Sequence, residues 1–309
     1  MSPEFWFPNL GIYFERVPQY LITIGDFSIY LYAVCIVTGI MSAYFLAVWW
    51  AKKTGQDPNV YTDLLLLGVV LAFIGLRLYY MIFNWDSFRG QSFIAAFLDI
   101  RRGGLAIYGG IIGAFLAGVI MSKRKKIPFS TFADTCAPSL LIGQIIGRFG
   151  NFFNAEAFGG YTDGLFALRI RLDRTRIPTH MLPEPFITHG GYEYIQVHPT
   201  FFYESFFNLL LMIALIIYRP YKRFDGEMLL WYMFGYGVIR FFLEGLRVDQ
   251  LMFFGTNFAA SRIVSGLFVG VAIILLARGY MYAKMPKEEP VETVKPVKRK
   301  KKAKNKGKS

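Results

Sequence analysis

Lysine is absent from four long stretches of this 309-residue chain, residues 1–51, 54–121, 127–221 and 223–283. Charged residues make up only 18% of the sequence, which is less than a soluble protein of this size carries. The lysine-free stretches are apolar and rich in Phe, Leu, Ile and Gly, and lysine returns at their ends. This pattern is typical of a multi-spanning membrane protein whose basic loops are cytoplasmic.

Motifs for thiol chemistry, metal binding and nucleotide binding are also missing. The chain has only two cysteines, Cys35 and Cys136, and both fall inside apolar runs. We expect them to be packed residues, neither disulfide-bonded nor nucleophilic. The three histidines show no zinc-ligand spacing, so no metal is expected. Neither a Walker motif nor a dinucleotide fingerprint is present, and no cofactor is predicted.

The apolar stretches are long enough for seven membrane-spanning helices, each of which needs roughly 20 apolar residues. The predicted spans are Phe27–Trp50, Leu64–Phe83, Gly104–Met121, Cys136–Phe153, Thr200–Tyr218, Met228–Leu246 and Ile263–Tyr282. The basic islands at 52–53, 122–126 and 218–223 and the basic tail fall on one side only if there are seven spans. We therefore predict an all-α polytopic membrane protein with an extracytoplasmic N-terminus and a cytoplasmic C-terminus.

The loops and termini suggest three regions. Residues 1–26 form an extracytoplasmic segment, and residues 27–283 form the membrane domain. A small cap, residues 159–197, is inserted between spans four and five, and the alternation in Phe166–Leu172 predicts a short strand there. Residues 284–309 form a basic tail that carries much of the net charge of +13. We expect that tail to be disordered or to meet anionic lipid, and we expect no nucleic-acid partner.

Polar residues cluster late in span four. Arg148, Asn151 and Asn154 are three residues apart, so they share a helix face. Gly143, Gly147 and Gly150 alongside them permit close approach of a helix or a lipid head group. An arginine with amide partners is suited to holding a phosphate. The alternative is an arginine that supports helix packing.

A second cluster lies at the outer end of span six. Arg240, Glu244 and Arg247 are spaced by four and three residues and therefore share one face. Glu244 can pair with either arginine, which leaves the other free for an anion. A purely structural ladder of ion pairs is equally compatible with the spacing.

Further candidate residues lie at the starts of spans three and five. His198 lies near the outer interface as an acid–base group or a structural hydrogen bonder, and Glu204 shares a helix face with Asn208. Two Gly-Gly pairs in Gly103–Gly110 predict irregular backbone lining a cavity, with Tyr108 in the cavity or against a neighbouring helix. Two further intramembrane polar residues, Arg77 in span two and Tyr32 in span one, are ambiguous alone.

Four segments in this order resemble the prolipoprotein diacylglyceryl transferase family of the bacterial inner membrane. They are Gly103–Gly110, Gly147–Asn154, His198–Glu204 and Tyr236–Arg247, and the resemblance covers nearly the whole chain except the basic tail. It implies a multi-pass protein of the cytoplasmic (inner) membrane that acts on phosphatidylglycerol and on prolipoproteins. The diacylglyceryl group would pass to the lipobox cysteine thiol beside the signal peptide. A thioether would form and glycerol phosphate would leave, as the first step of lipoprotein maturation.

The resemblance also implies roles for single residues. Arg148 and Arg240 match the two arginines on which the family relies, and Asn151 and Gly159 match its signature segment. Tyr32 matches a tyrosine of the first helix that contacts the lipid. Glu244 and Arg247 match the partners of the second arginine, with His198, Glu204, Asn154 and Arg77 as supporting residues.

One position departs from the family pattern, because Tyr108 stands where many members carry histidine. Tyrosine has an unperturbed pKa of about 10, so a catalytic base here would need a strongly lowered pKa. Tyr108 is therefore either a hydrogen-bonding positioner, or another group or water deprotonates the thiol. In either case, fixed guanidiniums in a dry site would stabilise the charge that grows on a phosphate leaving group.

Two other classes of function remain as alternatives. A lipid or small-molecule transporter could have an arginine-lined pocket, although the chain has no internal repeat. A different phospholipid-using enzyme would usually need acidic metal-binding clusters or a phosphatase motif, and the spans contain neither.

Overall fold

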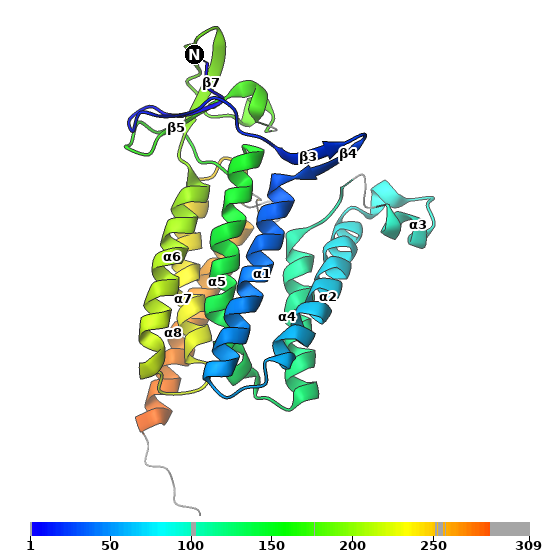
Figure 1. The fold of residues 1–309 in the computed structure, drawn as a ribbon, viewed down its shortest axis with the longest axis vertical. Helices are drawn as coiled ribbons and strands as arrows, with labels where there is room; N and C mark the ends of the chain where they lie inside the picture. The colour runs from blue at the N-terminus through cyan, green and yellow to red at the C-terminus, as the bar shows by residue number, and fades with distance from the viewer. Residues whose placement is uncertain are drawn as a thin grey trace, which may run out of the picture.

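Seven long helices run side by side, and a small β-sheet covers one end of the bundle (Figure 1). The computed structural model describes residues 2–99, 103–175, 177–250, 252, 256 and 258–284, and these counts concern that part of the chain. The long helices are α1 Leu31–Lys53, α2 Asn59–Phe83, α4 Ile107–Lys125, α5 Phe129–Asn154, α6 Thr200–Tyr218, α7 Glu227–Glu244 and α8 Ala260–Lys284. A short helix, α3 Phe93–Leu98, lies in the connection between α2 and α4. The predicted tail, apart from Lys284, lies outside the described residues.

Five of these helices, α1, α2, α4, α6 and α8, are long and apolar enough to cross a membrane by themselves. Many of their large apolar side chains face outward, such as Leu66, Val70, Ile217 and Ile274. Helices α5 and α7 carry the arginine clusters. Helix α5 packs against α1, α4, α6 and α7, and α7 packs against α5, α6 and α8. The protein is therefore a mostly helical polytopic membrane protein in which neighbours shield the polar helices from lipid.

The first helix begins later than predicted. Residues Phe27–Tyr30 form strand β4, which pairs with β3 Tyr20–Ile24 in an antiparallel hairpin. Gly25 has a φ of +58° in the two-residue turn between Ile24 and Phe27, where glycine adopts the left-handed conformation without strain. The aromatic and β-branched residues after the turn favour a strand. As a result α1 starts at Leu31, not at Phe27.

The cap contains a five-stranded antiparallel sheet, so the expectation of an all-α chain was wrong. Its strands are β1 Phe5–Phe7, β2 Ile12–Phe14, β5 Leu168–Arg171, β6 Ile187–His189 and β7 Tyr192–Val197, in the order β2-β1-β5-β7-β6. Strand β5 falls inside the predicted short strand. The first two strands come from the N-terminal segment, which the sequence had suggested to be separate from the cap.

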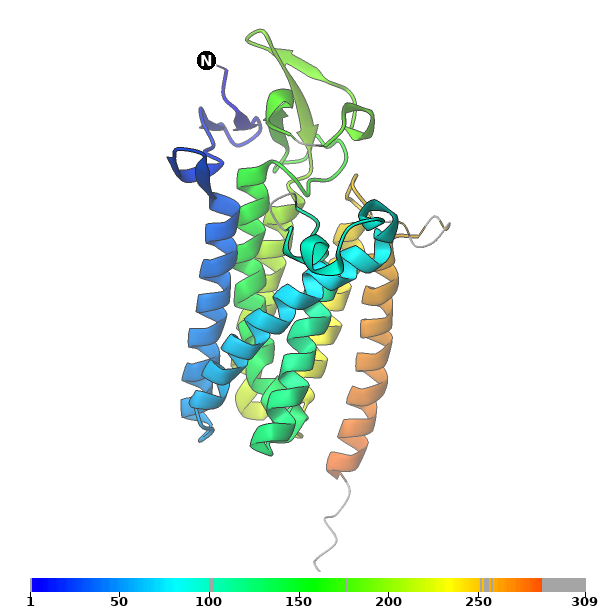
Figure 2. The ribbon, with the colours of Figure 1, turned by 90° about the vertical axis from the view of Figure 1, so that its right-hand side faces the viewer.

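The cap is joined to the bundle by a shared apolar core. Phe5 of β1 and Ile195 of β7 are fully buried, and Phe152 at the end of α5 and Phe201 at the start of α6 pack against the same cluster. The rings of Phe5 and Phe152 meet edge to face, with centroids 5.0 Å apart. The sheet therefore has a defined position over the outer ends of α5 and α6 (Figures 1 and 2).

The two glycine pairs at the start of α4 have different structures. Gly103 and Gly104 have φ values of +84° and +80°, as expected for irregular backbone. Gly109 and Gly110 are helical instead, and a Cβ on Gly109 would lie only 2.0 Å from the carbonyl oxygen of Gly75. The second pair thus permits close packing of α4 on α2, and the prediction of irregular backbone there was wrong.

Candidate functional site

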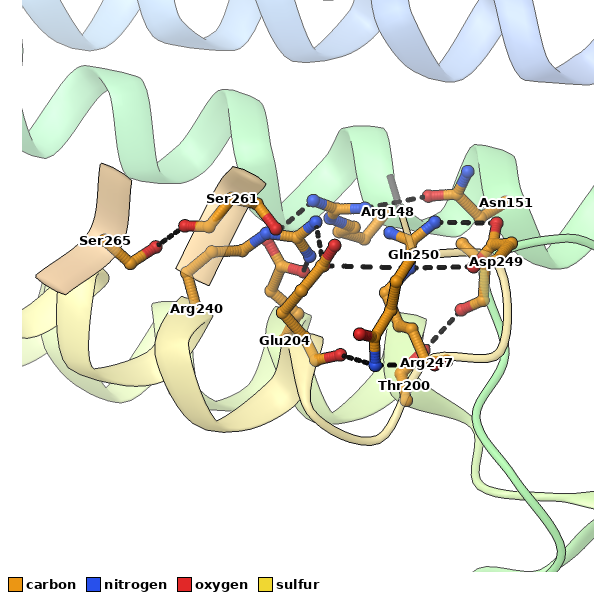
Figure 3. Close-up of polar contacts among 12 residues, drawn as sticks. Arg148, Asn151, Thr200, Glu204, Arg240, Arg247, Asp249, Gln250, Ser261 and Ser265 are labelled. Atoms are coloured by element: carbon orange, nitrogen blue, oxygen red, sulfur yellow. Dashed lines mark hydrogen bonds and ion pairs between the residues drawn. The ribbon is translucent and has the colours of Figure 1, made fainter. Parts of the chain in front are cut away.

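Two arginines from different helices share one buried carboxylate. Arg148 Nη2 of α5 lies 2.7 Å from Glu204 Oε1 of α6, and Arg240 Nη1 of α7 lies 3.0 Å from Glu204 Oε2 (Figure 3). The Glu204 side chain is 3% exposed, whereas the Arg148 and Arg240 side chains are 21% and 15% exposed. The carboxylate is thus enclosed between guanidiniums that are themselves accessible.

Arg240 also belongs to a series of ion pairs at the end of α7, which we call the charged ladder and which includes Glu244 and Arg247. Arg240 Nη2 lies 2.5 Å from Glu244 Oε2, one turn further along the helix. Arg247 is 3.9 Å from that carboxylate and bonds instead to Asp249 through two atoms, at 3.0 and 2.8 Å. Glu244 therefore pairs mainly with Arg240. Arg247 is held by Asp249 and is not free for an anion, so the structure shows the ladder of ion pairs that was the second sequence alternative.

A hydrogen-bonded group closes the outer end of α5. Arg148 Nη1 reaches Asn151 Oδ1 at 3.5 Å, and the amides of Asn151 and Asn154 both donate to Glu156 Oε1, at 3.1 and 3.2 Å. The helix ends at Ala155 in the left-handed conformation, with a φ of 51°, which turns the chain back so that Glu156 meets both amides. The predicted common face of these residues is present.

Gly159 lies where the cap, α6 and the end of α7 meet. Its backbone N–H donates to the carbonyl of His198 at 2.8 Å, and the N–H of Gly160 donates to the carbonyl of Leu246 at 2.9 Å. A Cβ on Gly159 would lie 2.9 Å from both Leu246 O and His198 Cβ, so a larger residue would push these segments apart. This junction fixes the chain just before Arg247.

The imidazole of His198 faces Tyr203, with Nδ1 3.4 Å from the hydroxyl oxygen. Burial lowers the pKa of His198 below its usual value, so the ring is neutral at pH 7. A neutral ring can donate or accept one hydrogen bond, which fits the structural alternative and leaves an acid–base role open.

Two tyrosines line the approaches to the arginine pair. The ring of Tyr32 on α1 packs against Gly150, where an added Cβ would lie 2.8 Å from Tyr32 Cδ2. Tyr108 on α4 lies 6.1 Å from Tyr79 of α2, centroid to centroid, and within electrostatic range of Arg240 and Glu244. Tyr108 therefore packs beside a neighbouring helix, as one of the two sequence alternatives supposed.

Arg77 lies apart from this group. Arg77 is on α2 and is 2% exposed. Its guanidinium donates to the backbone carbonyls of residues 96, 97, 99, 103 and 104. These bonds hold the connection between α3 and α4. Any support that Arg77 gives the site therefore acts through this connection.

Sequence reasoning missed several partners. Glu204 was predicted to share a face with Asn208 and to support the site, but its bridge between the two arginines was not predicted. Tyr236 of α7 donates to Glu204 Oε1 at 3.4 Å, and Glu156 and Asp249 complete the two ends of the network. The sequence did contain a signal for the pairing of Glu204, because its carboxylate lies inside an apolar span. A buried charge requires a partner of opposite sign.

The geometry suits an anionic group that gains charge during a reaction. Two guanidiniums held by a common carboxylate cannot move freely, and their remaining N–H donors lie in a site largely closed to water. Within the described residues no group of three or more His, Cys, Asp or Glu side chains is placed to hold a metal ion.

Comparison with known proteins adds independent information. The sequence profile described as prolipoprotein diacylglyceryl transferase matches residues 19–278. A phosphatidylglycerol–prolipoprotein diacylglyceryl transferase of Listeria innocua is 39% identical over 255 residues, covering 82% of this chain and 87% of the relative. Proteins of the same name from Listeria monocytogenes and Bacillus cereus are 37% and 35% identical, covering 87% and 85% of this chain and 91% and 93% of theirs.

Proposed function

Because the chain belongs to the prolipoprotein diacylglyceryl transferase family, we propose that it transfers the diacylglyceryl group of phosphatidylglycerol to the lipobox cysteine of prolipoproteins. The observation that carries the proposal is the convergence of Arg148 and Arg240 on Glu204 between three helices. Both guanidiniums are held in place and both remain accessible, which is what recognition of a phosphate requires.

In the proposed reaction the thiolate sulfur of the prolipoprotein attacks the glyceryl carbon that carries the phosphate. The new C–S thioether bond forms as the C–O bond to phosphate breaks, and glycerol phosphate leaves with the bonding electrons. Arg148 and Arg240 would bind the phosphate oxygens and stabilise the charge that grows on them. Glu204 and Glu244 would orient the guanidiniums, and Asn151, Tyr32 and Gly159 would shape the binding site for the lipid.

The thiol proton must leave before or during the attack. The positive field of the two arginines would favour the thiolate. Tyr108 lies within electrostatic range of the charged ladder and would position the thiol or a water molecule by a hydrogen bond. The enzyme would need no cysteine of its own, because the substrate brings the nucleophile.

We further propose that all seven long helices cross the bacterial cytoplasmic membrane, with the cap outside and the tail inside. The basic residues at the ends of α1, α4 and α8 support this orientation, since these ends lie away from the cap (Figure 1). The arginine pair then lies toward the outer leaflet, where a signal peptide emerging across the membrane would present its cysteine.

The test is a transfer assay with purified full-length protein, phosphatidylglycerol and a peptide that carries a lipobox cysteine. Mass spectrometry should detect the thioether-linked diacylglyceryl peptide and free glycerol phosphate. A matched peptide with serine in place of cysteine should give no product. Lipid movement between vesicles without thioether formation would instead support the transporter, and would overturn the proposed function.

A further inference from the structure

A hollow lined by several charged residues lies at the end of the bundle away from the cap. It has a volume of about 490 Å³ and is formed where the end of α1, the start of α5 and the turn after α6 meet. Its lining includes Trp50, Lys53, Gln56, Asp134, Arg219 and Lys222. None of these residues belongs to the arginine pair or its partners, so this hollow has no part in the proposed transfer.

The positive charges of the hollow exceed its negative charges. Asp134 accepts from Lys222 Nζ at 3.0 Å and from the backbone N–H groups of Gly226 and Leu229 at 2.8 and 3.1 Å. Lys222 also pairs with Asp225 at 2.7 Å. The carboxylate of Asp134 and the ammonium of Lys222 are therefore already neutralised by each other and by their neighbours.

Two further cations have no carboxylate partner within the described part of the chain. The Arg219 guanidinium lies 4.1 Å above the Trp50 ring, and its hydrogen bond is to the backbone carbonyl of Asp134 at 3.3 Å. Lys53 Nζ lies 3.9 Å above the Trp49 ring. Stacking on indole rings holds both cations in place without cancelling their charge.

An unused hydrogen-bond donor accompanies these charges. The side chain of Trp50 is part of the lining, and the residue is only 9% exposed. Its indole N–H has no hydrogen-bond partner among the described residues. A buried donor without an acceptor is costly, so an unpaired N–H beside these cations needs an explanation.

From this geometry we infer that the hollow binds the phosphate group of an anionic phospholipid in the cytoplasmic leaflet. Arg219 and Lys53 supply the charge, and the Trp50 ring holds Arg219 in place. Trp49 and Trp50 are typical of residues at the membrane interface, which is the depth of lipid head groups. Basic pockets between helices at this face are suited to anionic lipids. The assignment to the cytoplasmic leaflet depends on the proposed orientation of the protein. The binding site itself does not.

The test measures binding of dioleoyl phosphatidic acid, which presents a phosphate but lacks the glycerol head group that the proposed transfer releases. Full-length protein in neutral detergent is titrated with this lipid, and native mass spectrometry counts the bound molecules. An Arg148→Ala background weakens binding at the catalytic pair. The double variant Lys53→Gln/Arg219→Gln should bind the lipid at least about tenfold more weakly, because two charged donors are lost.

The matched control is Lys52→Gln/Arg223→Gln, which removes the same charge from neighbouring positions that do not line the hollow. It should bind as the parent does. Lys53→Gln alone, on the unaltered background, keeps the test usable if a combined variant fails to fold. Equal binding by the double variant and the control would overturn the inference.

Soluble anions distinguish the source of the phosphate. Inorganic phosphate and glycerol 3-phosphate should compete weakly, because they lack acyl chains, and phosphatidylcholine should not compete. Competition by inorganic phosphate as strong as that of the lipid would overturn the lipid assignment. With Arg148 intact, Lys53→Gln/Arg219→Gln should transfer the diacylglyceryl group in detergent at the wild-type rate, because neither residue belongs to the arginine pair. Failure of the binding test therefore leaves the proposed function untouched.

Discussion

Arg77 differs from Arg148 and Arg240 in the groups that accept hydrogen bonds from its guanidinium. Arg77 is 2% exposed and donates only to backbone carbonyls between residues 96 and 104. Arg148 and Arg240 are more accessible, and they bind carboxylates and an amide side chain. In the sequence, Arg148 and Arg240 stand in polar clusters, whereas Arg77 is ambiguous alone.

The difference separates a structural arginine from one that can act on a ligand. Five carbonyls leave Arg77 no donor for a substrate, so its bonds hold one conformation of the loop. The pair on Glu204 is held by side chains and keeps its positive charge near an accessible surface. We therefore propose Arg148 and Arg240, and not Arg77, as substrate-binding arginines because of how their donors are satisfied, and not because of burial alone.

The largest effect is expected from Glu204→Gln, which removes the charge that the two arginines share. Two guanidiniums then lie close together without their common counter-charge, and the free energy of unfolding should fall by about 3–5 kcal/mol. Thermal unfolding in detergent measures this loss. An unchanged melting temperature would mean that the bridge is not a stabilising contact.

Arg148→Lys and Arg240→Lys should each slow transfer by roughly 10²–10³-fold, because lysine cannot reproduce the forked contacts to phosphate. Their melting temperatures should change little, since the pairing charge is kept. The assay compares kcat with phosphatidylglycerol and a lipobox peptide. Wild-type rates for the lysine variants would refute forked recognition of the phosphate.

Arg77→Met should show the opposite pattern. Several buried carbonyls lose their donor, so stability should fall by roughly 3 kcal/mol. The kcat per folded molecule should stay within a few-fold of the parent. A large drop in kcat with an unchanged melting temperature would place Arg77 in the chemistry and remove the contrast with Arg148.

Gly159→Ala and Gly160→Ala form a matched pair at the cap junction. The added Cβ at position 159 meets two atoms at 2.9 Å, whereas a Cβ at position 160 meets nothing within 4 Å. We expect Gly159→Ala to cost about 1–3 kcal/mol by overpacking and to lower kcat. Gly160→Ala should behave as the parent in both measurements. Equal effects would show that steric crowding at the junction is not the cause.

The smallest effect is expected for Tyr108→Phe, which removes only a hydroxyl group. If Tyr108 positions the thiol or water, kcat should fall by about tenfold or less, and its pH dependence should keep its shape. A general base would contribute roughly 10²–10⁴-fold. A loss in that range, with a changed pH profile, would identify Tyr108 as the base.

Much of the architecture could be predicted from the sequence because membrane helices follow simple rules. Apolar length located the seven long helices to within a few residues at most ends, and basic residues marked one end of the bundle. The rule failed at Phe27–Tyr30, where a hairpin turn at Gly25 outweighed apolar length. It also could not place the N-terminal strands, of which β1 pairs with β5 across more than half of the chain and β2 pairs with β1.

The sequence predicted most residues of the candidate site, but it did not predict which of them contact one another. Helical spacing linked Arg240 to Glu244 and Arg148 to Asn151, because residues three or four apart meet on one face. It could not link Glu204 to Arg148 or Arg240, which lie on three different helices. It also could not separate Arg77 from the pair, since the carbonyls that saturate Arg77 belong to a distant loop.

The sequence by itself determined that this chain is a membrane bundle with basic ends on one side and that it belongs to one transferase family. Those properties depend on local composition and short motifs. Only the tertiary structure decided which charges meet, because the partner of a buried ion is set by how separate helices pack and not by their order along the chain.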